Sequence, residues 1–347
     1  MTNHTARALC SMLLVATIVV GITTSASAQS QHVNVYTTRE PGLVEALFEA
    51  FKVQTGITVN TVFISQGVAE RLIAEGENSP ADLIMMVDYG QLINLVDRGL
   101  TQPVQSNILD EVVPANLRDP ANNWFSLSLR ARVIYVSAER VDIDSLTYED
   151  LADPEWDGRV CARSGQHAYS TSLFAAYLAK HGEVATTDYL RNLHDNLARR
   201  AGGGDRDGAR DILAGICDLA IGNSYYVGLM RSGAGGAEQQ EWGAAIRVIL
   251  PTFEDGLGTH VNISGAAIAR HAPHYDNALR LLEFLVSPEA QELYARDNFE
   301  YPVRRDVPAD PIIAALGEFI VDPTPLSEIS AFRTRASQLV DVVGFDN

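Results

Sequence analysis

Two adjacent tyrosines, Tyr225 and Tyr226, follow the short apolar segment 217–221. A loop at that position can aim both phenol oxygens at one point. A deprotonated phenol is a hard anionic oxygen donor, and a hard cation such as Fe(III) prefers this donor to imidazole or thiolate. The same two residues are also compatible with ordinary half-buried aromatics. The pair therefore suggests a metal site, and the rest of the sequence is needed to distinguish a metal site from ordinary packed aromatics.

The N-terminus has the features of a secretory signal peptide over residues 1–28. Arg7 supplies a positive charge, residues 9–22 are apolar, and Ala26-Ser27-Ala28 matches a cleavage site. No later stretch approaches the ~18 apolar residues of a membrane-spanning helix. We expect a mature protein that begins near Gln29 and lies outside the cytoplasm.

Two cysteines, Cys161 and Cys217, remain after Cys10 is lost with the signal. An oxidising compartment permits a disulfide between them, but their spacing is equally compatible with two buried thiols. No Cys-x-x-Cys or His-x-x-x-His cluster accompanies them, which argues against zinc. The formal net charge of −18 argues against nucleic acid and against an anionic membrane surface as partners.

The elements that must position the tyrosines form two α/β sets. In the first set, apolar strands near 32–38, 57–64 and 82–87 alternate with helices, which predicts a parallel sheet flanked by helices. Ligands of such sheets lie beyond the carboxyl ends of the strands. In this chain those ends carry Thr37 to Glu40, Ser65 to Gly67, and Asp88-Tyr89.

The long extended run 124–137 can leave the first lobe and enter a second one, and it carries Arg130 and Arg132 on one face. A second α/β set follows, and the stretch 247–269 can cross back. The chain is too long for one small core. We therefore expect an α/β clamshell of two lobes with two crossover strands. The expected divisions are an N-lobe of 29–128 and 254–305, a C-lobe of 129–253, and C-terminal helices 306–347 on the C-lobe.

Between residues 32 and 305, an ordered series of segments resembles the periplasmic iron-binding proteins of ABC importers, the tyrosine-rich ferric-binding protein family. These segments include Arg130-Ala-Arg-Val-Ile-Tyr, Leu146-Thr-Tyr-Glu-Asp-Leu-Ala-Asp-Pro, Arg163-Ser-Gly-Gln-His-Ala-Tyr-Ser, Gly222-Asn-Ser-Tyr-Tyr, Asn262-Ile-Ser-Gly-Ala and Leu282-Glu-Phe-Leu-Val-Ser-Pro-Glu-Ala-Gln. The resemblance implies a type II periplasmic binding protein with its metal between the lobes.

The resemblance also implies the ligand set. It assigns three phenolate ligands, Tyr169, Tyr225 and Tyr226, and a cleft arginine at Arg130, with Arg132 as the second choice. A phenol has an ordinary pKa near 10, so each ligand must lose its proton to the metal. Three phenolates would balance the charge of Fe(III).

The first loop departs from the family pattern. Several relatives have a His-Tyr pair after the first strand, where this chain has Arg39-Glu40-Pro41. The remaining iron positions are open to water, to a small anion such as carbonate, or to Glu40. An anion would pair with Arg130, and Glu40 would pair with Arg39 or Arg130. Two further candidates are Tyr36, facing either cleft or core, and Gln166, supporting the ligands.

These observations predict a monomeric, non-enzymatic carrier in the periplasm that binds iron and delivers it to an inner-membrane ABC permease. The sequence favours Fe(III) and leaves Fe(II) open. A carrier of an anion, sugar or polyamine is the nearest alternative, because a fold does not determine its ligand. A secreted hydrolase is disfavoured, because neither G-x-S-x-G nor H-E-x-x-H occurs.

Overall fold

The computed structural model describes Met1 and residues 31–347. The expected signal peptide and the mature start at Gln29 therefore lie, apart from Met1, outside the described residues. Within the described part of the chain, no helix combines the length and the apolar character needed to cross a membrane.

Nine strands form one sheet in the order β2-β1-β3-β8-β4-β6-β5, with β7 and β9 also paired to β4. The strands are β1 (His32–Thr37), β2 (Thr58–Phe63), β3 (Leu83–Met86), β4 (Phe125–Ser137), β5 (Val160–Cys161), β6 (Leu219–Asn223), β7 (Ile246–Ile249), β8 (Val261–Ile268) and β9 (Tyr301–Pro302).

The described chain also forms α-helices and short 3-10 helices. The α-helices are α1 (Glu45–Thr55), α2 (Val68–Glu75), α3 (Tyr89–Asp97), α4 (Asn107–Val112), α5 (Ala168–Asp195), α6 (Asp205–Leu213), α7 (Ser224–Ser232), α8 (Ala237–Ala244), α9 (Tyr275–Leu285), α10 (Pro288–Asn298), α11 (Pro311–Ala314), α12 (Leu326–Ser330) and α13 (Arg333–Val343). The 3-10 helices are η1 (Pro41–Leu43), η2 (Gly76–Asn78), η3 (Ala115–Leu117), η4 (Glu149–Ala152) and η5 (Pro154–Trp156).

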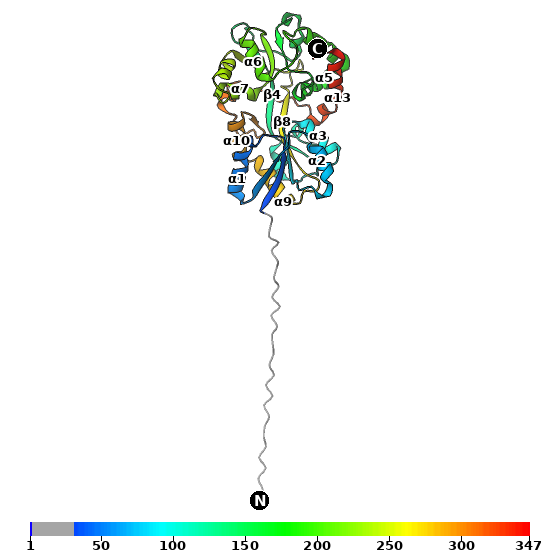
Figure 1. The fold of residues 1–347 in the computed structure, drawn as a ribbon, viewed down its shortest axis with the longest axis vertical. Helices are drawn as coiled ribbons and strands as arrows, with labels where there is room; N and C mark the ends of the chain where they lie inside the picture. The colour runs from blue at the N-terminus through cyan, green and yellow to red at the C-terminus, as the bar shows by residue number, and fades with distance from the viewer. Residues whose placement is uncertain (2–30) are drawn as a thin grey trace.

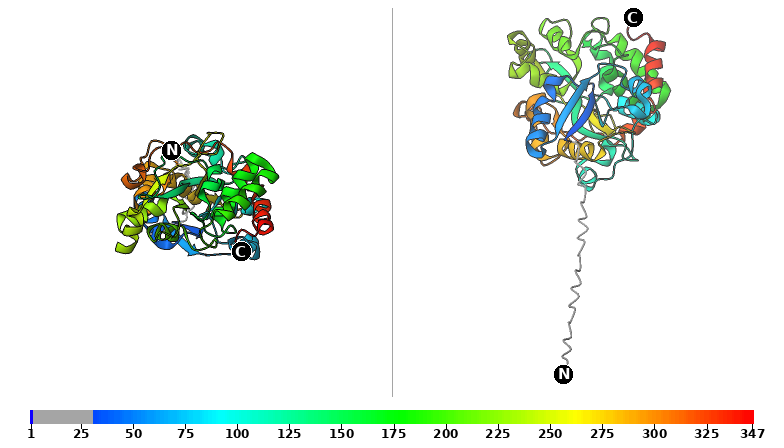
Figure 2. Two further views of the ribbon diagram at one scale, coloured as in Figure 1. Left: turned by 90° about the horizontal axis from the view of Figure 1, so that it is seen from above. Right: turned by 60° about the horizontal axis from the view of Figure 1, so that its bottom comes forward.

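The N-terminal lobe is built on β1, β2 and β3, which pair in parallel as the sequence predicts. Helices lie on both sides of these strands, as the tilted view in Figure 2 shows. In β1 the side chains of Val33 and Val35 are buried, and α1 buries Leu47 and Phe51. Gly56 ends α1 in the left-handed conformation (φ 73°), which glycine adopts without steric cost. β8 joins this sheet antiparallel to β3.

Strand β4 belongs to both lobes, and all of its residues are buried. Residues 125–131 pair with β8, whereas residues 132–137 pair with β6 and β7. In Figure 1 the N-terminal lobe lies below, the C-terminal lobe above, and β4 and β8 run between them. We propose that the chain changes lobe within β4 and returns between β7 and β8, near the expected divisions after residues 128 and 253. The division at residue 305 stays a prediction.

The C-terminal lobe holds the elements that follow β4. Cys161 and Cys217 form a disulfide with their Cα atoms 5.9 Å apart, which decides between the two alternatives left open by the sequence. The sequence predicted two separate helices near 172–181 and 189–198, and the structure agrees: α5 consists of two helical segments that meet at Gly182, whose φ (77°) and ψ (175°) are non-helical. The first segment begins at Ala168, four residues earlier than expected.

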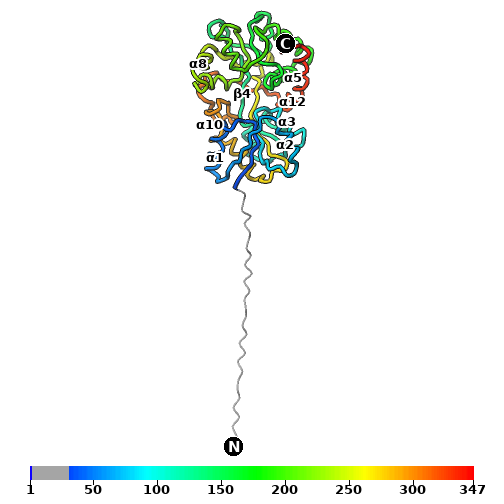
Figure 3. The backbone as a smooth tube through the Cα atoms, in the orientation of Figure 1, coloured from blue at the N-terminus to red at the C-terminus, as the bar shows by residue number. Residues whose placement is uncertain are grey.

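The C-terminal helices pack against both lobes. Helix α13 packs along α5, whereas α12 contacts α5 and also α3 of the N-terminal lobe. Figure 3 shows α12 at the edge of the molecule, below α5 and above α3.

The disulfide joins β5 to the segment before β6 and closes a long loop. We expect its removal, by Cys161→Ser with Cys217→Ser or by reduction, to lower the free energy of unfolding by about 2 to 4 kcal/mol. Urea unfolding followed by circular dichroism measures this change. A loss below about 0.5 kcal/mol would show that packing alone holds β5 and β6 together.

Candidate metal centre

Tyr225 and Tyr226 lie in the first turn of α7, not in a loop as the sequence suggested. The turn is fixed by the end of β6, where the Tyr135 hydroxyl donates to the Asn223 carbonyl (2.7 Å). Gly222 leaves room for the Tyr135 ring, since a Cβ at that glycine would lie 2.2 Å from the Tyr135 Cζ. Helix α7 therefore starts at a defined point and presents both phenols from its N-terminus.

The rings of Tyr225 and Tyr226 are in contact, with centroids 4.0 Å apart. Burial raises the pKa of Tyr225 well above its ordinary value, and the phenols of Tyr169 and Tyr226 raise it further. Burial also raises the pKa of Tyr226. Both phenols are therefore protonated at neutral pH until a cation displaces their protons.

Tyr169 lies in the first turn of α5, and its phenol reaches the same region. Its backbone N–H donates to Nδ1 of the capping residue His167 (3.2 Å). Its hydroxyl accepts a hydrogen bond from Nη1 of Arg130 (3.3 Å), and Arg163 lies over its ring at 5.3 Å. The structure thus brings the three tyrosines together at the positive ends of two helices, where developing phenolate charge is favoured.

Arg130 is buried and acts across the two lobes. Its Nη2 donates to the carbonyl oxygens of Val87, just after β3, and Ile263, in β8. Burial lowers the pKa of Arg130, but Tyr169 and other nearby anionic groups raise it by more, so the net pKa is raised. Among the described residues, no carboxylate lies within ion-pair distance of Arg130, although Glu300 and Asp88 act on it electrostatically.

Arg132 is also buried, but it supports the scaffold instead of contacting the phenols. Its Nη1 donates to Asp205 (2.6 Å) and to Asn223 (3.3 Å). The other Asp205 oxygen accepts from Arg163 (2.9 Å). Arg130, Arg132 and Asp205 are all buried.

Two of the candidates on the first loop lie in different environments. Arg39 is buried and pairs with Glu300 (2.6 Å), and it also donates to Ser264. This pairing occupies Arg39 and removes it as a partner for Glu40. Glu40 is exposed beside η1.

Tyr36 and Gln166 are held away from the phenols by other partners. The Tyr36 hydroxyl donates to Glu75 on α2 (2.8 Å). The Gln166 amide donates to Asp341 on α13 (2.8 Å). These contacts give both residues structural roles, and their proposed contribution to the metal site stays a prediction.

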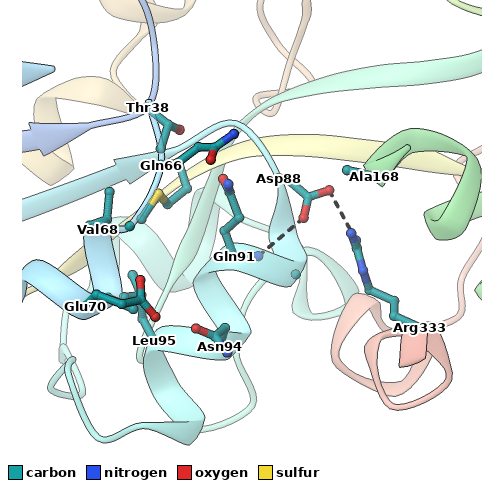
Figure 4. Close-up of a pocket in the computed structure, with 14 residues that line it drawn as sticks. Thr38, Gln66, Val68, Glu70, Asp88, Gln91, Asn94, Leu95, Ala168 and Arg333 are labelled. Atoms are coloured by element: carbon teal, nitrogen blue, oxygen red, sulfur yellow. Dashed lines mark hydrogen bonds and ion pairs between the residues drawn. The ribbon is translucent and has the colours of Figure 1, made fainter. Parts of the chain in front are cut away.

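A pocket of about 340 Å³ lies mainly against the N-terminal lobe, and Ala168 and Arg333 complete its lining. Figure 4 shows it between the carboxyl ends of the N-lobe strands, α2, α3, Ala168 and Arg333. Its lining includes Thr38, Gln66 and Asp88, which belong to the strand ends that the sequence predicted to face a ligand. Ala168 precedes Tyr169 in the chain, but none of the three tyrosines lines this pocket.

The described residues contain no group of three or more His, Cys, Asp or Glu side chains able to hold a metal ion. Sequence reasoning missed the roles of Arg163, Glu300 and Arg206, whose guanidinium lies 5.5 Å from the Tyr226 ring centroid. Asp205 had a weak signal, because it begins a helix after three glycines, but no local pattern reveals a buried pair such as Arg39–Glu300.

Residues 36–292 match the family model for bacterial extracellular solute-binding proteins. Iron uptake protein A2 of Synechocystis sp. is 40% identical over 96% of this chain and 95% of its own length. A Bordetella ferric binding protein superposes with a TM-score of 0.88 at 55% identity, covering 91% of this chain and 100% of the other. A Trichodesmium protein solved with iron and citrate ligands gives a TM-score of 0.86 at 36% identity, covering 90% and 99%. These structures confirm the expected two-lobed fold.

The Asp205 carboxylate forms ion pairs with Arg132 and Arg163, so its removal should destabilise the protein. We expect Asp205→Ala to lower the free energy of unfolding by about 3 to 5 kcal/mol, because two cations lose their buried partner. Asp207→Ala is the matched control. Asp207 caps the same helix through the Gly204 N–H, so its loss should cost about 1 kcal/mol. Equal losses in chemical denaturation would contradict the buried-pair account.

The buried His260 makes the free energy of unfolding depend on pH. It is buried, with Nε2 2.8 Å from the Ser172 hydroxyl, and burial lowers its pKa to about 3. The histidine of the unfolded chain has a pKa near 6.5. The stabilisation that depends on a neutral His260 is therefore fully present above pH 6.5 and is lost as the pH falls toward 3. Between pH 7.5 and 5.5 the wild type should lose about 1.4 kcal/mol more than His260→Gln, as measured by urea unfolding. Parallel pH profiles would contradict a neutral buried His260.

Proposed function

The chain belongs to the family of bacterial extracellular solute-binding proteins, and on that basis we propose that it is a periplasmic iron-binding protein serving an ABC importer. The family consists of solute-binding proteins, not of enzymes. The observation that carries the proposal is the convergence of Tyr169, Tyr225 and Tyr226 with Arg130 at the junction of the lobes. The names of the Synechocystis and Bordetella relatives, iron uptake protein and ferric binding protein, support iron as the cargo.

The three phenols suit Fe(III) better than Fe(II). As phenolates they carry three negative charges, which balance a 3+ ion, whereas Fe(II) would leave one charge uncompensated. The raised pKa values of Tyr225 and Tyr226 keep these two phenols uncharged at physiological pH in the empty site. Iron must therefore displace protons as it binds, and its apparent affinity should fall as pH falls.

The remaining iron positions fall to water or to a small anion such as carbonate. Arg130 is the cation placed to neutralise that anion, because Arg39 is occupied by Glu300. The Trichodesmium relative was solved with citrate as well as iron, which supports an accompanying anion. Glu40 is exposed on the first loop and would have to move with the N-terminal lobe to reach the metal.

The proposed partner is an inner-membrane ABC permease that receives iron from a monomeric carrier. The expected secretory signal supports a periplasmic location, as do relatives named periplasmic, such as the Fe(3+)-binding periplasmic protein of Serratia marcescens. Closure of the two lobes about β4 and β8 is the motion expected for this architecture.

Titration of the mature protein with Fe(III) should produce a visible phenolate-to-iron charge-transfer band. We expect Tyr225→Phe, Tyr226→Phe and Tyr169→Phe each to shift or abolish the band and to weaken iron binding at least tenfold, because each removes an anionic ligand. Absorption spectroscopy with a competing chelator measures both effects.

Tyr36→Phe is the matched control, since the Tyr36 hydroxyl bonds to Glu75 and should leave the band unchanged. A colourless wild type would contradict the phenolate site and would direct attention to a non-metal cargo. A band lost in Tyr36→Phe but kept in the other variants would place the metal elsewhere.

A further inference from the structure

We propose that α12 and α13 form a strap between the lobes, and that Arg333 is a positioning residue that holds the lobes closed around the cargo. The strap is defined here as residues 326–343. That the strap controls iron release rests on the proposed function, but its effect on lobe closure does not.

The strap reaches the N-terminal lobe through Arg333, the first residue of α13. Arg333 Nη1 donates to Asp88 Oδ2 (3.2 Å), and its guanidinium lies 5.0 Å from the centroid of the Tyr89 ring. Burial lowers the pKa of Arg333, but Asp88 and Tyr89 raise it by more. The guanidinium of Arg333 thus connects the C-terminal helices to the N-terminus of α3.

The Asp88 side chain is itself fixed by two further hydrogen bonds. Its side chain accepts from the Gln91 N–H (3.3 Å) at the start of α3 and from Nδ2 of Asn262 (2.7 Å) in β8. Figure 4 shows Asp88 between the Gln91 N–H and Arg333. A contact to Asp88 therefore positions the strap against both α3 and the central strands.

A second bridge between the lobes lies beside the first. The Ser172 hydroxyl of α5 donates to the Tyr89 hydroxyl (3.0 Å), and Ser172 also lies 2.8 Å from Nε2 of His260. Tyr89 is buried between these groups and the Arg333 guanidinium. The N-terminus of α3 is consequently held from two sides by C-lobe elements.

The other end of the strap is tied to the loop that leads into Tyr169. Asp341 of α13 accepts from Gln166 (2.8 Å), and Asp346 accepts from the Gly165 N–H (2.7 Å). Gly165 also lies directly against Val340, since a Cβ there would come within 2.7 Å of a Val340 methyl. The strap thus links α3 of one lobe to the segment that positions a proposed iron ligand in the other.

The strap also borders the pocket at the strand ends of the N-terminal lobe. Arg333 forms one wall of the pocket of about 340 Å³, facing Gln66 and Gln91, and Ala168 lines the same pocket. Releasing Arg333 would remove its contact with Asp88 and widen this pocket. Lobe opening would in this way be coupled to one ion pair.

The test compares iron release and molecular size in matched variants. Arg333→Ala removes the cross-lobe contact. Gly90→Ala keeps the charge but displaces the guanidinium, because a Cβ at Gly90 would lie 2.7 Å from the Arg333 Cζ. The control is Arg335→Ala, because Arg335 lies on the same helix and pairs with Glu183 of α5, within the C-terminal lobe.

We expect both Arg333→Ala and Gly90→Ala to release iron to an external chelator about tenfold faster, a typical size for coupling between sites. Stopped-flow loss of the charge-transfer band measures this rate. Small-angle X-ray scattering of the iron-free proteins should show a larger radius of gyration for both variants, and Arg335→Ala should match the wild type in both measurements.

Wild-type release rates and an unchanged radius of gyration in Gly90→Ala and Arg333→Ala would overturn the strap. If Arg333→Ala does not fold, Gly90→Ala decides alone. If the wild type binds no iron, the proposed function fails, and the scattering comparison still decides whether the strap holds the lobes.

Discussion

A buried cation without a contacting carboxylate, Arg130, is the constraint on which the candidate centre depends. Its two terminal nitrogens donate to two backbone carbonyls of the N-terminal lobe and to the hydroxyl of Tyr169 in the other lobe, whereas its buried Nε has no partner. An isolated buried charge is costly, so a neighbouring group that gains negative charge is favoured there. In the proposed function, phenols that release their protons to a metal would provide that charge, and Arg130 would favour an anionic ligand set at the junction of the lobes.

Strand β4 holds this cation between the two lobes. The strand is buried along its whole length, and its two halves pair with different neighbours. Arg130 lies in the half that pairs with β8, and Arg132 lies at the start of the half that pairs with β6. The two arginines are two residues apart on one strand and have different contacts. Arg130 contacts the phenol of Tyr169, whereas Arg132 pairs with Asp205, the first residue of α6.

The sequence predicted the parts of this structure that depend on local periodicity. The parallel strands β1 to β3, the long crossover strand and the residues at the strand ends follow from apolar alternation and turn residues. The placement of the tyrosines was less accurate. Helix α5 begins earlier than the pattern indicated, where His167 caps its first turn, and the tyrosine pair lies in helix α7 instead of a loop.

Contacts between distant residues could not be predicted from one sequence. Arg39 and Glu300 are 261 positions apart, and Arg333 and Asp88 are 245 apart. Their pairing depends on how the lobes and the C-terminal helices meet, which no local pattern records. For the same reason the sequence left Arg39 available to Glu40, whereas the structure commits it to Glu300.

The most direct test is an anomalous difference map at the iron absorption edge, from crystals of the mature protein loaded with Fe(III). The account predicts one strong iron peak bonded to the phenol oxygens of Tyr169, Tyr225 and Tyr226, with Arg130 beside any remaining anionic ligand. An iron peak bonded to other residues, or tyrosines that point away from the metal, would contradict it.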